Sequence, residues 1–335
     1  MPIRLAPGAR LSEFARSTAG SLLLCWVGPA LAEQPLSLGL EVTTGYDSNP
    51  AQSEAGMGLF FAQYAFDAAR RMRLGGADLT FAASGWLRDY EAANDSHRLA
   101  LRTDWSRATA QGAGLMTLSL AGAAYRDALV PADERDEAAL TLRYDYILTA
   151  RDTLGLMGET RRLAYRNASL PWSGRPGSSP RDHPSGSSNS SSNSSGRGRE
   201  VEAVRRDDWL SGLGIDVTHH WSPVLATVFS LAGARRDSPV SAEAYDRHGL
   251  GLVMRIEPAA SWRLELGLGW SRTRYDQAPR QQEREDIQRT LGLAVRRNLG
   301  RSEWFCGLDW LDSDSSIAGR SFRQEVTECG LAWSF

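Results

Sequence analysis

The chain has no lysine, only five histidines and only three cysteines in 335 residues. All 38 basic residues are arginine, and they face 40 acidic residues. The formal charge of −2 therefore predicts neither a nucleic-acid partner nor another strongly charged one. Beyond the N-terminal segment no apolar run approaches the roughly 18 residues of a membrane-spanning helix.

The first 32 residues have the composition of a secretory signal peptide. Three arginines precede a short apolar segment, AGSLLLCWVGPALA, that ends in the small-x-small sequence Ala30-Leu31-Ala32. We therefore predict cleavage after Ala32 and export of a mature chain that comprises residues 33–335.

Strand-like alternation of apolar and polar residues fills the rest of the chain. In SWRLELGLGW, for example, Leu264, Leu266 and Leu268 alternate with Arg263 and Glu265. Such segments lie near 36–46, 57–67, 75–90, 97–107, 114–126, 137–149, 154–166, 207–219, 224–236, 247–257, 261–275, 285–297, 303–313 and 320–335. Most are about 10–13 residues long, which suits a strand that crosses a membrane rather than the usual soluble strand of about 5–6 residues.

The connections between these segments alternate in length. Short turns are expected near 68–74, 108–113, 150–153, 220–223, 258–260 and 298–302, and longer polar loops separate the other segments. The longest, 167–206, is rich in Ser, Gly and Asn and is predicted to be a disordered extracellular loop. This pattern predicts an all-β protein, a transmembrane up-and-down antiparallel β-barrel of about 14 strands in a Gram-negative outer membrane. Merging two weak segments would give twelve strands.

Aromatic residues mark where the expected membrane begins and ends. Trp262 and Trp270 are eight residues apart, about 26 Å along a strand and roughly 20 Å in depth at a tilt near 40°. They would therefore lie at the two membrane interfaces, with the leucines between them in hydrocarbon. The last segment places Trp333 and Phe335 on one face, and its terminal aromatic resembles the signal that the barrel-assembly machinery reads. Membrane lipids and that machinery are thus the expected partners.

The opposite face of the alternation carries charges of both signs. The residues expected to line the lumen are Arg102, Asp104, Arg143, Asp145, Arg255, Arg263 and Glu265. They predict either a network of ion pairs that holds the wall or a polar conduit that selects solutes. Because the signs are mixed, a strongly anion- or cation-specific pore is not expected.

Two cysteines remain in the mature chain, Cys306 and Cys329. If the last hairpin turns near 317–318, they lie directly opposite each other on the lipid face, in an oxidising compartment. The sequence leaves two alternatives open, a disulfide or two free thiols.

Catalytic and metal chemistry find little support. NDSHR (94–98) contains serine and histidine, but successive residues of a strand point to opposite faces. The adjacent pair His219-His220 lacks the further ligands of a metal site. No enzyme, cofactor or metal site is therefore predicted.

A short motif closes the first segment and opens the first long loop: Gly45, Tyr46, Asp47, Ser48, Asn49 and Pro50. It resembles the GYDSN motif at the first strand of the barrel domain of surface lipoprotein assembly modifiers and related outer-membrane barrels. The expected strand number is also similar to that family's fourteen. The tetratricopeptide-repeat domain common in that family is not expected here, because about three residues separate the predicted cleavage site from the first strand segment.

The resemblance implies a conduit or an assembly factor that moves a lipoprotein or another polypeptide across the outer membrane. Two alternatives stay open: a general small-solute porin, and a structural or adhesive surface barrel. The residues themselves give the motif a simpler explanation as a turn, with Tyr46 as an interface aromatic.

Overall fold

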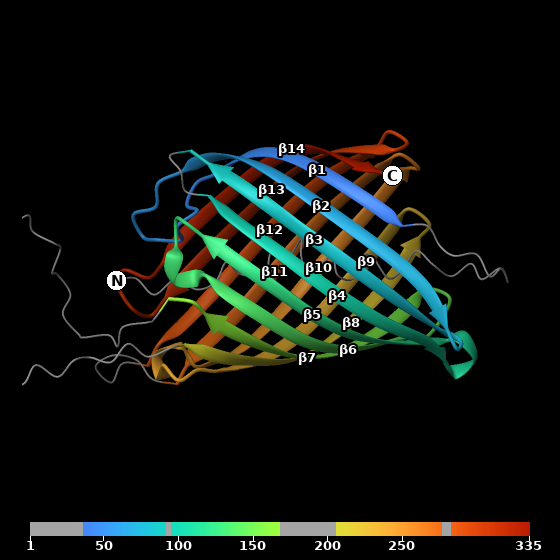
Figure 1. Cartoon of the computed structure of the whole chain (residues 1–335), viewed down its shortest axis with the longest axis horizontal. Helices are drawn as coiled ribbons and strands as arrows, with labels where there is room; N and C mark the ends of the chain where they lie inside the picture. The colour runs from blue at the N-terminus through green and yellow to red at the C-terminus, as the bar shows by residue number, and fades with distance from the viewer. Residues whose placement is uncertain (1–35, 92–94, 168–205, 277–282) are drawn as a thin grey trace, which may run out of the picture.

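The computed structural model describes residues 36–91, 95–167, 206–276 and 283–335, which form one closed antiparallel barrel (Figure 1). Each strand pairs with its neighbours in sequence, and β1 pairs with β14 to close the ring. The strands are β1 (Ser37–Asp47), β2 (Leu59–Leu74), β3 (Ala77–Tyr90), β4 (Ser96–Thr109), β5 (Gly114–Asp127), β6 (Arg135–Ile147), β7 (Asp152–Tyr165), β8 (Asp207–Ser222), β9 (Leu225–Asp237), β10 (Tyr245–Ala259), β11 (Trp262–Tyr275), β12 (Glu285–Asn298), β13 (Ser302–Ser315) and β14 (Phe322–Ser334). Fourteen strands are therefore confirmed over the described residues, and the twelve-strand alternative is wrong.

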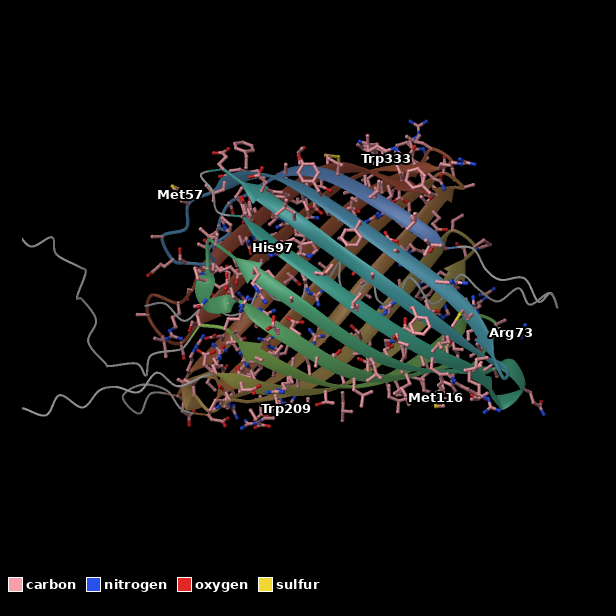
Figure 2. The ribbon with its side chains drawn as sticks, viewed as in Figure 1. Met57, Arg73, His97, Met116, Trp209 and Trp333 are labelled. Atoms are coloured by element: carbon pink, nitrogen blue, oxygen red, sulfur yellow. A yellow bond between two sulfur atoms is a disulfide. The ribbon has the colours of Figure 1, made fainter. Side chains whose placement is uncertain are left out.

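The barrel has two unlike ends. Six short connections join the strands at one end, which we call the turn end, and Phe335 bonds to Leu38 there. The opposite, loop end carries the longer connections, three of which contain the short 3-10 helix η2 (Pro131–Asp133), the short 3-10 helix η3 (Ser241–Glu243) or the motif residues after β1. In Figure 2, Met57 and Trp209 lie toward the loop end and Arg73 and Met116 toward the turn end.

Two predicted segments lie outside the described residues: the signal peptide and almost all of the loop at 167–206. Among the residues that the structure does describe, no helix has the length and apolar character needed to cross a membrane.

One predicted turn is wrong. The segment 68–74 is not a turn but the second half of β2, which continues to Leu74. The chain reverses instead at Gly75 and Gly76, whose φ angles of 56° and 80° are open to glycine at no steric cost. A Gly-Gly pair is itself a hairpin signal. The second half of the strand was not predicted because of the three nearby arginines. One of them, Arg71, faces inward and pairs with Asp78 across the hairpin at 2.5 Å.

Apolar side chains point outward all around the barrel. Leu213, Leu101 and Phe60 are each more than half exposed, whereas acidic residues such as Asp47 and Asp216 are buried inside. Holding a leucine or phenylalanine side chain in water rather than in an apolar solvent costs about 1.5–3 kcal/mol. The outer face of this barrel is therefore built for contact with hydrocarbon, with its polar face turned inward.

Two neighbouring strands define the same apolar band. On β11 the outward residues between Trp262 and Trp270 are leucines. On β12, Arg297 lies opposite Trp262 and Arg289 lies opposite Trp270, and the outward residues between the two arginines are again apolar. Tryptophan and arginine thus bracket one stretch at both ends, as expected where hydrocarbon meets water.

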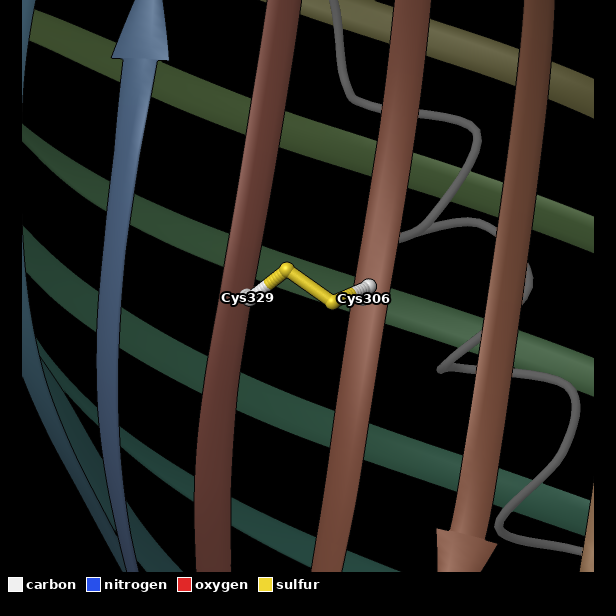
Figure 3. Close-up of a disulfide and its surroundings, with 2 residues drawn as sticks. All are labelled: Cys306 and Cys329. Atoms are coloured by element: carbon white, nitrogen blue, oxygen red, sulfur yellow. A yellow bond between two sulfur atoms is a disulfide. The ribbon is translucent and has the colours of Figure 1, made fainter.

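A disulfide joins β13 and β14 inside this band (Figure 3). Cys306 and Cys329 are register partners, with a Cα–Cα distance of 4.1 Å, and Val295 lies beside Cys306 on β12. Of the two alternatives that the sequence left open, the structure has the bridged one.

We expect the mature protein, denatured without reductant, to contain no thiol that iodoacetamide alkylates. In the folded protein a charged, hydrophilic reductant should leave the bridge intact, because the bond lies on the lipid-facing surface. Intact-mass spectrometry before and after reduction measures both effects. Cys306→Ser is the matched control, because it leaves Cys329 unpaired and open to alkylation. Two alkylatable thiols in the unreduced native chain would show that the bridge does not form.

Candidate functional site in the barrel interior

The inward face of the barrel carries all seven charged residues that the alternation assigned to the lumen. Arg102 and Asp104 are on β4, Arg143 and Asp145 on β6, and the other three on β10 and β11. All seven are paired. Arg102 contacts Asp104 at 2.9 Å, and Arg255 on β10 donates from Nε to Glu265 on β11 at 2.8 Å. Arg263 pairs instead with Glu257, a further acid that is not among the predicted lumen residues.

Arg143 is the centre of a three-residue charge cluster. Its guanidinium contacts Asp145 on its own strand at 2.6 Å and reaches over β7 to Asp216 on β8 at 3.1 Å. Gly155 on β7 lies between them, and a Cβ there would come within 2.6 Å of both Arg143 and Asp216. The glycine therefore makes room for an ion pair that spans three strands.

The loop end of the interior holds a second, more deeply buried network, the mouth cluster, which consists of Tyr165, Arg206, Asp208, Arg236 and Glu243. Asp208 is fully buried and accepts from Nε of Arg206 and Nε of Arg236, each at 2.9 Å. Arg206 also donates to Glu243 at 3.0 Å and stacks on the Tyr165 ring at 3.9 Å, and Arg236 donates to the Tyr165 hydroxyl at 2.6 Å. Fixed, charge-assisted contacts of this kind hold β7, β8, β9 and the loop before β10 together.

Arginines stacked on inward aromatic rings recur around the loop end. Arg88 lies 4.3 Å from the centre of the Phe61 ring, and Arg284 lies 3.8 Å from that of Tyr275. These side chains are almost completely buried, whereas Arg102, nearer the turn end, has a side chain that is 52% exposed. The interior is therefore open to solvent toward the turn end and closely packed toward the loop end.

Asp133 is a buried acid at this closed end, in η2. Burial is the main reason that its pKa is raised from 3.8 to about 7, with further upward contributions from Asp127 and Glu243. Arg135 and Arg206 oppose the shift but do not cancel it. Asp133 thus holds its proton up to near-neutral pH.

The motif after β1 fastens the seam where the barrel closes. Asp47 accepts two hydrogen bonds from the amide of Gln324 on β14, at 2.8 and 2.9 Å. Ser48 accepts from the backbone N–H of Glu325 at 2.7 Å and returns one bond from its own N–H. Asn49 donates to the carbonyl that precedes Gln324. Three consecutive polar residues thus bind β14, which is more than the turn that the sequence predicted.

The remaining motif residues are also explained by packing. A Cβ at Gly45 would lie 2.6 Å from the ring of Phe61, which covers this glycine from β2. Tyr46 points outward and packs on Phe60, with ring centres 5.0 Å apart. Pro50 follows in the loop itself.

Trp262, Trp270, Trp333 and Phe335 all lie on the outer face, and Phe335 is the most exposed of the four. Figure 2 shows Trp333 on the half of the barrel that contains the turn end. Their role at the membrane interface stays a prediction.

Ser96 and His97 are held apart, because Ser96 is buried on the inner face and His97 is exposed on the outer face. His219 bonds to Asp152 at 2.6 Å on the outer face. In the described part of the chain, no group of three histidine, cysteine or acidic residues is placed to hold a metal ion.

The mouth cluster is what sequence reasoning missed. Asp208 and Arg236 occupy inward positions in the alternation of their strands, so the same pattern could have predicted them. Arg206 and Glu243 lie outside the strands, where no periodicity applies.

Comparison with known proteins supports the architecture. No protein-family model matches the sequence, and no curated protein matches it closely. Among solved structures, a bacterial polysaccharide outer membrane secretin aligns with 91% of this chain and 99% of its own, at a TM-score of 0.50 and 10% identity.

Two other solved structures are similar in extent. A loop-deletion mutant of OmpT, an outer membrane protein of Vibrio cholerae, covers 91% of this chain and all of its own, with a TM-score of 0.49 and 8% identity. An anion-selective porin from Comamonas acidovorans covers 90% of this chain and 99% of its own, with a TM-score of 0.48 and 10% identity. At 10% identity the likeness to the polysaccharide secretin shows the fold alone: this chain has the fold of an outer-membrane β-barrel. The resemblance to surface lipoprotein assembly modifiers gains no support from these comparisons.

Replacing Arg143 should destabilise the barrel strongly. Arg143→Gln leaves Asp145 and Asp216 without their shared cation, and breaking a largely buried ion pair costs about 3 kcal/mol. Arg102→Gln is the matched control, since its exposed pair is worth roughly 0–1 kcal/mol. Urea unfolding in lipid vesicles measures both. Equal losses for the two variants would contradict the assignment of Arg143 as a buried bridge.

The loop around Asp133 should be better ordered in mild acid. The folded chain keeps the proton of Asp133 up to about pH 7, whereas the unfolded chain loses it near 3.8, so stability falls as pH rises between these values. Hydrogen exchange of residues 130–134, corrected for intrinsic rates, should show more protection at about pH 5.5 than at about pH 8.5. Asp133→Asn should remove the difference, and an unchanged difference in that variant would refute the explanation.

Proposed function

We propose that this barrel is a passive channel for small polar solutes in a Gram-negative outer membrane. The observation that supports this most directly is the inversion of polarity: a closed ring of fourteen strands is apolar outside and carries charged pairs inside. About eight strands are enough for side chains to fill a barrel, so a fourteen-stranded ring has a wider interior. Partly exposed pairs such as Arg255–Glu265, whose side chains are 24% and 22% exposed, indicate that water reaches that interior from the turn end.

The loop end gives this channel a direction. With an even strand number both chain ends lie at the turn end, which we assign to the periplasm. The mouth cluster then lies at the outer surface, where it narrows the entrance. A solute would pass a tight, charged constriction first and a wider, hydrated vestibule second.

A role in moving a lipoprotein or another polypeptide is the second candidate, and it rests on the six motif residues alone. The contacts of these residues explain the motif as a connection between β1 and β14. They do not point to a surface that would bind a substrate. The packed mouth also favours small solutes over a folded passenger. A structural or adhesive barrel would need no hydrated interior.

We further propose that the chain is exported through a signal peptide that is cleaved after Ala32. The barrel-assembly machinery would recognise the terminal strand that ends in Phe335, and outer-membrane lipids would contact the outward face. These follow from the sequence pattern and from the outward position of Phe335.

Single-channel recording in planar bilayers tests the channel. We expect steady current steps from the refolded mature chain. Glu265→Cys places a thiol on the lumen face, and a charged methanethiosulfonate reagent should then reduce the current. Leu266→Cys, the next residue but on the lipid face, is the matched control and should not respond.

Folded protein that gives no current would refute the channel and favour a structural barrel. Equal responses from the two cysteine variants would refute the assigned orientation of the strands. Heat-dependent migration in gels establishes beforehand that each variant is folded.

A further inference from the structure

Three arginines on the inner wall converge on one carboxylate, that of Glu137 on β6. Arg98 on β4 and Arg161 on β7 contact the same oxygen, Oε2, at 3.3 and 3.5 Å. Arg135, two residues before Glu137, donates to the other oxygen, Oε1, at 2.8 Å. Because Arg98 and Arg161 share one oxygen atom, their guanidinium groups are neighbours although they come from strands on either side of β5 and β6.

This sharing leaves Arg98 with little compensation for its charge. Its contact with Oε2 of Glu137 is the one hydrogen bond that Arg98 makes within the described chain, although a guanidinium carries several N–H donors. Arg161 has a second acid, Glu159 on its own strand, at 2.9 Å. Within this set of contacts, three guanidinium groups therefore share two carboxylates.

The other acids of the interior do not take up these donors. Asp127, at the loop end of β5, uses both carboxylate oxygens in hydrogen bonds to its own strand and the loop that follows. Some buried carboxylate oxygens of the described interior have no hydrogen-bond partner, among them one each on Asp104, Asp208 and Glu243. The salt bridges of these three acids are made with other arginines, and none of them pairs with Arg98 or Arg161.

Both arginines are accessible from the lumen, and the wall beside them carries only short side chains. The side chains of Arg98 and Arg161 are 31% and 32% exposed. The next inward residue of β4 toward the turn end is Ala100, which lies opposite Ala123 on β5. Ala139 on β6 lies opposite Arg161. These alanines leave room for a small solute next to the two guanidinium groups.

Trp86 on β3 borders the same place. It is the register partner of Arg98, and its ring packs on that of Tyr125, with ring centres 6.1 Å apart. The other tryptophans that the structure describes all lie on the outer face. An indole on the inner wall provides apolar surface beside the charged groups.

We propose that Arg98 and Arg161 bind the carboxylate of a small organic solute, whose apolar body lies against Trp86 and the alanines. A guanidinium matches the planar geometry of a carboxylate, and such charge-assisted bonds are about twice as strong as neutral ones. The ligand would supply the third acid for the three arginines, which an uncharged solute could not do. The proposal rests on the channel function for the solute's route, but binding at this site is measured separately.

Isothermal titration of the folded mature chain in detergent tests the site, with sodium benzoate as the probe and sodium sulfate and benzamide as comparisons. We expect benzoate to bind more tightly than sulfate, and benzamide not to bind. Arg98→Gln should weaken benzoate binding about tenfold, as expected for the loss of a charged hydrogen bond. Arg255→Gln is the matched control, because it removes a lumen arginine that pairs with Glu265 on other strands, and it should bind benzoate normally.

Trp86→Leu separates the apolar contact from the charge. It leaves the contacts of Glu137 in place, and it should weaken benzoate binding about threefold without changing the affinity for sulfate. Arg98→Gln leaves Glu137 with two arginines, and heat-dependent migration in gels shows beforehand that both variants are folded.

Benzoate affinity no greater than that for benzamide, or unchanged in Arg98→Gln, overturns the site. Sulfate affinity equal to that for benzoate, with both unaffected by Trp86→Leu, overturns the assignment of an organic solute. A steady current in planar bilayers without any benzoate binding refutes the site alone. Silence in planar bilayers with benzoate binding intact refutes the channel alone.

Discussion

The closure of β1 onto β14 is the constraint on which the other features depend. A bilayer offers no partner to a free backbone N–H or C=O, so a spanning sheet must pair both of its edges. Nine register pairs join these two strands, from Gly39 with Ser334 to Asp47 with Val326. At the loop end the backbone pairing is continued by the side chains of Asp47, Ser48 and Asn49, which bind β14 where the two strands part. On its other side, β14 is joined to β13 by the disulfide.

Closure also determines where charge can be placed. Once the ring is complete, each strand has one face toward hydrocarbon and one toward the lumen. Every ionisable side chain near mid-membrane must then point into the lumen. Neighbouring strands are only about 4.8 Å apart, so charges of opposite sign meet across them. Arg143 extends this to a third strand because Gly155 leaves the wall bare beneath it. Glycine inside this barrel therefore does not simply widen the lumen; it accommodates the side chains of its neighbours.

The sequence carried the fold more fully than the site. Two-residue periodicity placed all fourteen strands and the inward position of residues such as Arg255 and Glu265, because side-chain direction in a strand is set by parity alone. The prediction was wrong at the end of β2, because several arginines were interpreted as part of a turn. The pair Gly75-Gly76 was the better turn signal. The mouth cluster could not be predicted as a whole, since Arg206 and Glu243 lie in connections whose path depends on tertiary contacts. Nor could the motif show its partners, because Gln324 and Glu325 each lie 277 residues along the chain from the motif residue that they contact.

The two ends of the lumen differ in how charge is balanced, and this follows from how they are built. Toward the turn end the wall consists of strands alone, and arginines such as Arg102 and Arg255 pair with an acid on their own or the neighbouring strand and remain partly hydrated. At the loop end the connections add residues that the strand register does not pair, among them Arg320 and Asp133. Some of these are absorbed, as Arg206 is between Asp208 and Glu243. Asp133 instead keeps its proton up to near-neutral pH, because its water-poor setting disfavours the charged form. Charge is thus balanced between strand residues along most of the lumen, whereas at the mouth it is balanced through residues of the connections.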